Sequence, residues 1–141
     1  MKSNRASALL HFFVNDEAFL GLMQRMTGID QIGSFSGNVY SIVPGQQHHD
    51  SWHSDSVGHR VLAMSINLSA GVFRGGVLEI RQRQSGEIVR RLANTGFGDG
   101  IVFRIARHLE HRVTDLEGAV RRTAFAGWFS TEPKFAELLK P

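Results

Sequence analysis

The chain contains no cysteine among its 141 residues. This absence excludes disulfide bonds, thiolate zinc sites and cysteine nucleophiles, and it leaves any metal ion to histidine and carboxylate ligands. Long apolar runs are also missing, because no stretch approaches the roughly 18 residues that a transmembrane helix needs. The start, MKSNRASALLHFFVNDE, has too short an apolar run for a signal peptide. We therefore expect a cytoplasmic protein without a membrane partner.

Proline is scarce as well, with 3 residues against 15 glycines, which favours many tight turns. Hydrophobic residues make up 42% of the chain and charged residues 21%, as in globular proteins. The net charge of +3 and the pI near 10.0 raise the question of nucleic acid. The basic residues are scattered, however, and several alternate with apolar residues, as on a solvated sheet face. Nucleic-acid binding is therefore not expected.

The segment NDEAFLGLMQRMTG predicts one helix over residues 16–27. Asn15 or Asp16 can cap its start, and Gly28 can cap its end. Its apolar face is expected to consist of Phe19, Leu22, Met23 and Met26.

Downstream of this helix the apolar period changes to two, which is typical of strands. The expected strands are 38–43, 60–68, 76–82, 87–95, 100–106, 109–115 and 121–130. The tail STEPKFAELLK predicts a short C-terminal helix. A helix followed by this many strands, with no βαβ alternation, indicates a sandwich or jelly roll. We expect a single domain, 1–141, with N-terminal helical support at 1–35 and a β-rich core at 36–130.

A histidine and an aspartate lie two residues apart in SWHSDS. On a strand, residues i and i+2 point to the same face, so His53 and Asp55 would lie side by side. An isolated His-x-Asp pair is more often structural than functional, so the chemistry depends on a later histidine. The candidates are His59, His108 and His111, of which His111 lies on an expected strand. Two histidines and one carboxylate form the facial triad of non-haem Fe(II) oxygenases, which leaves an open face for oxygen and a cosubstrate.

Several motifs in order over residues 38–130 resemble the Fe(II)/2-oxoglutarate-dependent oxygenases, in particular their prolyl-4-hydroxylase-like branch. VPGQQHHDSWHSD resembles the turn that leads into the family's His-x-Asp pair, and RVLAMSINLS resembles the strand that follows. FRGGVLEIR and GFGDGIVFRI resemble the family's Gly-Gly turn and the Gly-Asp turn before the distal histidine. HRVTDLEGAVRRTAFAGWF resembles the distal histidine, a loop, and an arginine before an aromatic pair. The resemblance implies a mainly β fold, the double-stranded β-helix (jelly roll), with the metal between its two sheets.

By this resemblance, His53, Asp55 and His111 bind Fe(II). An arginine six residues before Trp128 would bind the C5 carboxylate of 2-oxoglutarate, and that position is Arg122. Arginine suits this role because its planar fork meets a carboxylate with two hydrogen bonds.

Strand alternation agrees with Arg122, because Arg122 shares a face with Ala124 and Ala126, whose small side chains leave room for a ligand. The adjacent Arg121 would face the other way. The family often has a tyrosine before the Pro/Gly turn, where this chain has Val43. Tyr40, the only tyrosine, is therefore a second candidate for binding 2-oxoglutarate.

The function that the resemblance implies is that of a dioxygenase dependent on Fe(II), 2-oxoglutarate and O2, with ascorbate as a conceivable reductant. Its substrate would be a C–H bond of an amino acid, a peptide or a small metabolite, with release of succinate and CO2. A homodimer could cover the surface near the N-terminus. Two alternatives stay open. One is a cupin-like module that binds a metal or ligand without using Arg122, and the other is a nucleic-acid demethylase of the same superfamily.

Several further side chains have expected positions. Trp52 is expected to pack in the core rather than to stack on substrate, and Trp128 is expected in the core beneath the cosubstrate. Asn67 and Glu79 are polar residues on strands that could line the pocket. The phenylalanines expected in the core are Phe97, Phe103 and Phe125.

Overall fold

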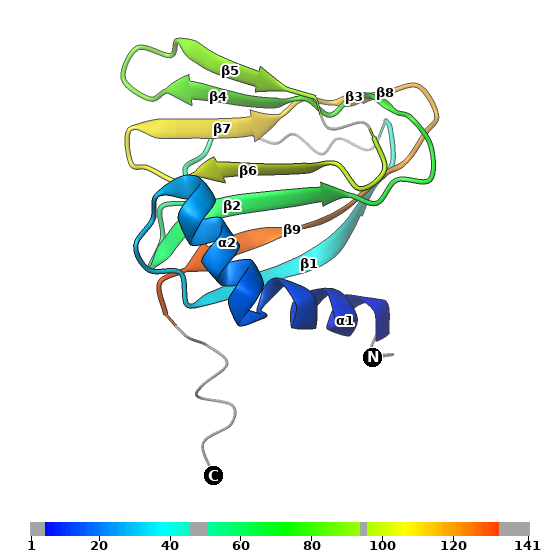
Figure 1. Ribbon diagram of the computed structural model, residues 1–141. Coiled ribbons are helices and arrows are strands. Elements are labelled where there is room, and N and C mark those ends of the chain that lie inside the picture. The colour runs from blue at the N-terminus through cyan, green and yellow to red at the C-terminus, as the bar shows by residue number, and fades with distance from the viewer. Residues whose placement is uncertain (1–4, 46–50, 94–95, 133–141) are drawn as a thin grey trace.

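The computed structural model describes residues 5–45, 51–93 and 96–132. Two helices precede a set of antiparallel strands (Figure 1). The helices are α1 (Arg5–Val14) and α2 (Glu17–Thr27). The strands are β1 (Ser34–Ile42), β2 (Arg60–Asn67), β3 (Arg74–Gly75), β4 (Leu78–Gln82), β5 (Ile88–Leu92), β6 (Gly100–Arg104), β7 (Leu109–Val113), β8 (Leu116–Glu117) and β9 (Arg122–Ser130).

Most of the strands form two sheets, which we call the four-stranded and the three-stranded sheet. The four-stranded sheet has the order β1-β9-β2-β6, and the three-stranded sheet has the order β5-β4-β7. The short strands β3 and β8 pair with each other. Every pairing is antiparallel. This mainly β arrangement is consistent with a jelly roll, and both helices lie against the four-stranded sheet (Figure 1).

The expected helix over 16–27 is confirmed as α2. The carboxylate of Asp16 accepts a hydrogen bond from the backbone N–H of Ala18 (2.9 Å) and so caps the start of the helix. Gly28 ends the helix with a φ of 67°, a conformation that glycine adopts without strain. The expected apolar face was partly wrong. Leu20 and Met23 are the buried residues of α2, whereas Leu22 and Met26 are exposed.

The prediction of a single N-terminal helix was wrong, because α1 precedes α2. No acidic residue occupies the first turn of α1, so the sequence carries no clear start signal. Asn15, which the sequence offered as a cap for α2, instead joins α1 to β1. Its side-chain amide donates to the carbonyl oxygen of His11 (2.9 Å), and its side-chain oxygen accepts from the backbone N–H of Phe35 (2.7 Å). The expected C-terminal helix lies mostly outside the described residues, and the described part ends at Glu132.

One face of the four-stranded sheet packs against the helices, and we call it the helix face. Alternate residues of its strands, such as Leu62 and Met64 of β2, point to this side. The buried members of the cluster are Val14, Leu20, Met23, Ile32, Phe35, Leu62, Met64, Phe125 and Phe129. The intervening residues of the same strands point toward the three-stranded sheet, and we call this side the cavity face. The hydrophobic core thus fixes which side chains reach the space between the sheets.

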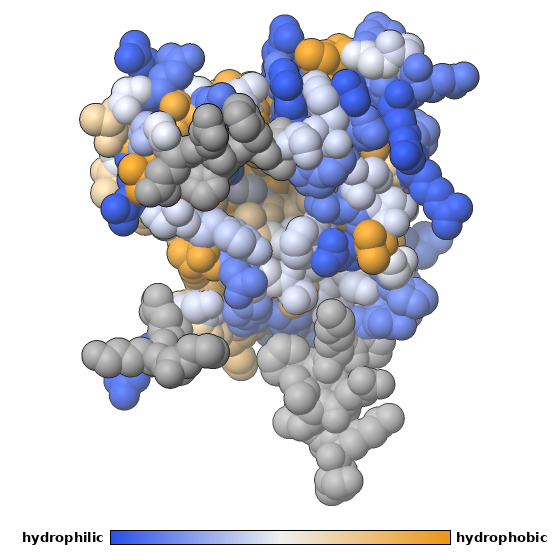
Figure 2. Space-filling model, turned by 180° about the vertical axis from the view of Figure 1, so that it is seen from behind, coloured by the Kyte–Doolittle hydropathy of each residue, from blue (hydrophilic) through white to orange (hydrophobic). Residues whose placement is uncertain are grey.

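The outer side of the three-stranded sheet is polar. Seen from behind, hydrophilic side chains gather over the upper part of the molecule, where this sheet lies (Figure 2). Glu79 lies there between the guanidinium groups of Arg91 and Arg112, and each arginine donates to it at 2.8 Å. Among the described residues, no helix is long and apolar enough to cross a membrane.

Candidate metal centre

His53 and His111 are held opposite each other by a short antiparallel bridge. The backbone N–H of His53 donates to the carbonyl oxygen of His111 (3.1 Å), and the N–H of His111 donates to the carbonyl oxygen of His53 (2.9 Å). On its other side, β7 pairs with β4, where His111 lies opposite Ile80. The loop before β2 is therefore fastened to the edge of the three-stranded sheet at the point where the His-x-Asp pair begins.

The side chains of His53, Asp55 and His111 converge. One potential ligand atom of each residue lies within 4.8 Å of the other two. Nε2 of His111 is 3.3 Å from Oδ2 of Asp55, and Nε2 of His53 is 3.8 Å from Oδ1. Ligand atoms that share a metal ion at about 2.1 Å lie roughly 3–4 Å apart, so the three residues fit one divalent cation. Two imidazoles and one carboxylate are also the ligand set of non-haem Fe(II) centres.

The backbone around His53 favours metal binding through one particular nitrogen. Nδ1 of His53 lies 2.7 Å from the carbonyl oxygen of Ser51, which can only accept a hydrogen bond. Nδ1 of the neutral ring therefore carries the proton, and Nε2 presents its lone pair toward Asp55. In this tautomer, a metal ion between Nε2 of His53 and the carboxylate of Asp55 would be bound by both groups. Orientation of a histidine ligand by a carbonyl oxygen is common in metal sites.

Asp55 is held as a carboxylate by its neighbours. Burial raises the pKa of Asp55, but hydrogen bonds from His111 and Trp128 and the attraction of the two imidazoles outweigh burial and lower the pKa to about 2. The indole N–H of Trp128 donates to Oδ2 of Asp55 at 2.6 Å. Asp55 is consequently ionised near neutral pH, as a metal ligand must be.

Trp128 therefore does more than the core packing expected of it. Its ring also lies 3.7 Å beneath the guanidinium carbon of Arg60, measured to the ring centroid. No local pattern in the sequence predicts these contacts, because Asp55 and Trp128 are separated by 73 residues. Only the pairing of β2 with β9, which sets Ala63 opposite Trp128, brings the indole near the loop that carries Asp55.

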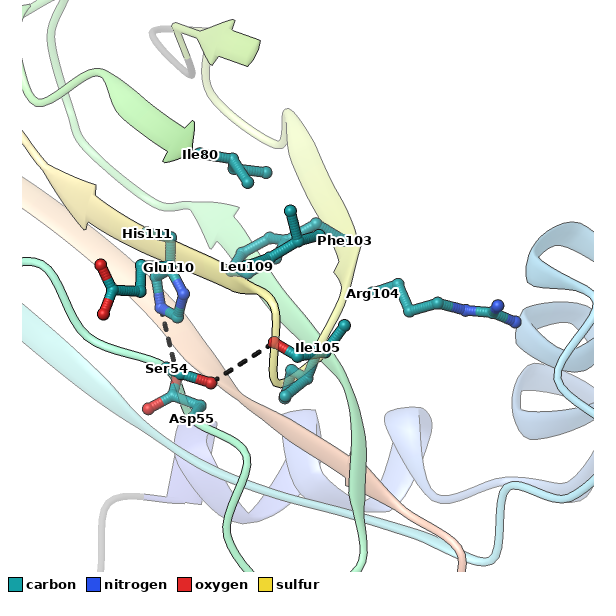
Figure 3. Close-up of a pocket in the computed structure, with 10 residues that line it drawn as sticks. Ser54, Asp55, Ile80, Phe103, Arg104, Ile105, Leu109, Glu110 and His111 are labelled. Atoms are coloured by element: carbon teal, nitrogen blue, oxygen red, sulfur yellow. Dashed lines mark hydrogen bonds and ion pairs between the residues drawn. The ribbon is translucent and has the colours of Figure 1, made fainter. Parts of the chain in front are cut away.

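Apolar side chains close one side of the triad. In Figure 3 the imidazole of His111 points toward Asp55, and Ile80, Phe103 and Leu109 lie on its other side. The ring of Phe103 meets the ring of His111 edge-on, with 4.8 Å between centroids. Phe103 therefore packs against the candidate ligand from across the space between the sheets.

A cavity of about 150 Å³ adjoins the triad on the cavity face. Asp55, His111 and Trp128 contribute to its wall, as do Ser65 and Arg122. The remaining lining residues are Ala63, Met64, Gly76, Leu78, Ile101, Phe103, Val113, Ala126 and Gly127. The cavity thus joins a candidate metal site to a cation in a mainly apolar enclosure, an arrangement typical of small-molecule sites.

Arg122 lies on the cavity wall, as strand alternation predicts, whereas Arg121 is exposed. The guanidinium group of Arg122 donates to the hydroxyl of Ser65 on β2 (3.3 Å). Gly76 has a φ of 61°, and a Cβ there would come within 3.0 Å of Leu116 and 3.1 Å of Phe73. The Gly-Gly turn therefore lets the backbone pass close to these two side chains next to Arg122.

The remaining expectations had mixed outcomes. Tyr40 lies opposite Ala124 on β1, but it is 44% exposed and does not line the described cavity, so its role stays a prediction. Phe125 is fully buried as expected, whereas the core position expected for Phe97 was wrong, because Phe97 is 77% exposed. Asn67 and Glu79 are buried without lining the cavity.

Asn67 instead holds a turn together. Its side-chain amide donates to the carbonyl oxygen of Gly96 (2.9 Å), and its side-chain oxygen accepts from the backbone N–H of Ser69 (2.9 Å).

The expectation that Trp52 packs in the core was wrong. It is half-buried on the outer side of the three-stranded sheet, where the guanidinium carbons of Arg81 and Arg112 lie 4.2 and 4.6 Å from its ring centroid.

Comparisons with known proteins agree with this site. The family model of the 2OG-Fe(II) oxygenase superfamily matches residues 36–130. The chain belongs to this superfamily. A search of curated proteins finds no match to the chain.

Two solved structures show the same fold. One is an oxidoreductase of the 2OG-Fe(II) oxygenase family from Burkholderia pseudomallei, with a TM-score of 0.64 and 19% identity over 89% of this chain and 55% of that chain. The other is a prolyl-4-hydroxylase from Pseudomonas putida, with a TM-score of 0.62 and 18% identity over 82% of this chain and 61% of that chain. The chain thus spans between 55% and 61% of the length of these two proteins.

Proposed function

We propose that the protein is an Fe(II)- and 2-oxoglutarate-dependent dioxygenase that hydroxylates an amino-acid, peptide or small-metabolite C–H bond. The observation that carries this proposal is the convergence of the His53, Asp55 and His111 side chains next to a cavity that Asp55, His111 and Arg122 line. Membership of the superfamily supports the same chemistry. The proposal includes the finer fold assignment, a double-stranded β-helix with the metal between its two sheets.

Each residue of the site has a proposed role. His53, Asp55 and His111 hold Fe(II) and leave its other positions open, and Trp128 keeps Asp55 oriented through the indole hydrogen bond. Arg122 binds the C5 carboxylate of 2-oxoglutarate, assisted by its neighbour Ser65. The bound iron supplies the oxygen activation that couples decarboxylation of 2-oxoglutarate, giving succinate and CO2, to hydroxylation of the substrate. The apolar wall excludes stray water from the site.

The first test is anaerobic titration with Mn(II), a redox-stable stand-in for Fe(II). Wild type is expected to bind one ion, and His53→Ala, Asp55→Ala and His111→Ala are each expected to lose binding. His108→Ala is the matched control, because His108 is an exposed histidine outside the triad. Undiminished affinity in one of the triad variants would remove that residue from the site.

Succinate formation from 2-oxoglutarate provides the second test. Turnover that requires Fe(II), O2 and Arg122 supports the dioxygenase. Stoichiometric metal binding without 2-oxoglutarate binding would instead favour the cupin-like binding module, for which Arg122 has no role.

A further inference from the structure

A second hollow lies on the other side of the triad. This outer cleft has a volume of about 450 Å³ and is lined by Trp52, His53, Ser54, Ser56, Arg83, Arg107 and Glu110. Its volume falls within the range of roughly 300–1,000 Å³ that is common for small-molecule sites. His53 is the candidate ligand that faces this cleft, whereas Asp55 and His111 face the inner cavity.

Exposure of the three candidate ligands follows this division. The side chain of His53 is 38% exposed, compared with 16% for Asp55 and 12% for His111. The triad therefore borders two hollows, the cavity that contains Arg122 and the outer cleft.

The outer cleft is positively charged. Arg83 and Arg107 lie on the turns after β4 and after β6, and a hydrogen bond from the backbone N–H of Arg83 to the carbonyl oxygen of His108 (2.9 Å) joins these turns. Glu110 is the acidic residue of the lining, and Arg81 already neutralises it with two hydrogen bonds of 2.9 and 2.7 Å to one oxygen. Arg83 lies 3.4 Å from the other oxygen of Glu110. Within the described part of the chain, Arg107 has no ion-pair partner.

We propose that the outer cleft binds the substrate and that this substrate carries a carboxylate, which Arg107 and Arg83 hold. The proposal rests on the proposed function and adds to it the chemical class of the substrate. Arginine forks match the geometry of a carboxylate, and the hydroxyls of Ser54 and Ser56 can donate further hydrogen bonds. Because Arg83 also lies near Glu110, the cleft offers little net positive charge, which favours a singly charged group over a phosphate dianion.

Trp52 gives the cleft a rigid aromatic wall next to His53. Its ring is held by the contacts with Arg81 and Arg112. A ring fixed in this way can pack against the carbon skeleton of a substrate while the carboxylate lies on the arginines. These contacts place the carboxylate away from Arg122, so the substrate and 2-oxoglutarate use different arginines.

The experiment measures binding of matched probe pairs to protein loaded with Mn(II) and saturated with 2-oxoglutarate, without O2. The probes are the N-acetyl derivatives of proline, leucine and lysine, each compared with the corresponding N-acetyl carboxamide. Paramagnetic broadening of the probe proton signals by Mn(II) gives both affinity and proximity to the metal. We expect at least one acid to bind about tenfold more tightly than its amide, because a charge-assisted pair is lost in the amide.

Arginine variants then locate the carboxylate. Arg107→Gln and Arg83→Gln are expected to reduce the preference for the acid at least threefold, without changing the affinity for Mn(II) or 2-oxoglutarate. Arg90→Gln is the matched control, since Arg90 is exposed on β5 and its guanidinium group donates to the carbonyl of the adjacent Val89. A preference that persists in both cleft variants overturns the proposal.

The remaining outcomes separate this inference from the proposed function. Normal binding of Mn(II) and 2-oxoglutarate with equal affinities in all three probe pairs overturns the substrate class alone. Failure to bind Mn(II) or 2-oxoglutarate overturns the proposed function and this inference with it. A short single-stranded DNA that broadens near Mn(II) and loses affinity in the same arginine variants, while the acids show no preference, would replace the carboxylate by a nucleic-acid backbone.

Discussion

On β9, Phe125 and Phe129 face the helices and have no exposed surface, whereas Ala124, Ala126 and Trp128 alternate with them and face the three-stranded sheet. The rings of Phe125 and Phe129 each meet the ring of Phe35, with 5.3 and 4.9 Å between centroids. Large side chains fill one side of the strand, and mostly small ones leave the cavity on the other.

The two faces of the four-stranded sheet have different roles: the helix face contributes to folding stability, and the cavity face contributes to the candidate site. The helix face buries aromatic side chains in the core, where the loss of a single group is strongly destabilising. The cavity face adjoins a charged and hydrogen-bonded set of half-buried side chains, which consists of Asp55, Arg122 and Trp128. We therefore expect substitutions on the helix face to change folding, and substitutions on the cavity face to change ligand affinity.

Phe125→Ala is expected to give the largest effect, on the helix face. Truncation of a fully buried phenylalanine lowers the free energy of unfolding by about 3–5 kcal/mol. Chemical denaturation of the metal-free protein measures this change. Mn(II) affinity of the folded fraction should change by less than about threefold, since Phe125 points away from the cavity.

Phe97→Ala is the matched control, because the same truncation at a side chain that is 77% exposed should change stability by less than about 0.5 kcal/mol. Similar losses of stability in the two variants would contradict the division between the faces.

Arg122→Leu is the corresponding change on the cavity face. Removal of one partner of a buried charge pair costs about 2–5 kcal/mol, so the dissociation constant for 2-oxoglutarate should rise by roughly 30-fold or more. Calorimetric titration of 2-oxoglutarate into the Mn(II)-loaded protein measures this constant.

Arg121→Leu tests the register of β9, because the exposed Arg121 should contribute less than about 1 kcal/mol. A larger effect of Arg121 than of Arg122 would mean that the face assignment is reversed. No effect of either would remove 2-oxoglutarate from the proposal.

Local sequence patterns predicted correctly those parts of the site that lie on regular strands. The period of two over 121–130 predicted that Arg122 and Ala126 share a face, and both line the cavity. The spacing of His53 and Asp55 and the position of His111 on a later strand predicted a shared ligand set, and their side chains converge.

Positions that depend on contacts between distant segments were not predicted, because such contacts produce no local sequence pattern. Asn15 looked like a helix cap, but its side chain bonds to Phe35. Phe97 looked like a core residue because it is apolar, yet it lies in a glycine-rich turn at the surface. Trp52 occupies a position that alternation alone assigns to the core, but that position is the outer side of a sheet lined by arginines.

Trp128→Phe tests whether the hydrogen bond to Asp55 supports the metal site. Loss of a hydrogen-bond partner of a metal ligand typically lowers metal affinity by about 10–100-fold, and phenylalanine keeps most of the ring while removing the N–H. Mn(II) titration measures the affinity, and denaturation should show a smaller change in stability than in Phe125→Ala. Arg60→Gln keeps the indole N–H, so its effect on Mn(II) affinity should be smaller. Equal affinities of Trp128→Phe and wild type would show that Asp55 is positioned without the indole.

Glu79→Gln is expected to give the smallest effect, on the outer side of the three-stranded sheet. Hydrogen bonds from Arg91 and Arg112 lower the pKa of Glu79 against the opposing effect of burial. Because the folded-state pKa of Glu79 is below the unfolded value, the stabilisation is present at neutral pH and is lost as pH falls through the folded-state pKa.

The side chains of Arg91 and Arg112 are 64% and 40% exposed, so the stabilisation should be only about 1 kcal/mol. Denaturation of wild type and Glu79→Gln should therefore show a difference at neutral pH that shrinks as the pH falls below the ordinary pKa of a glutamate carboxyl group. Glu87→Gln, a change at an exposed glutamate, is the control, and a Glu79→Gln difference that stays constant with pH would show that the ion pairs do not stabilise the sheet.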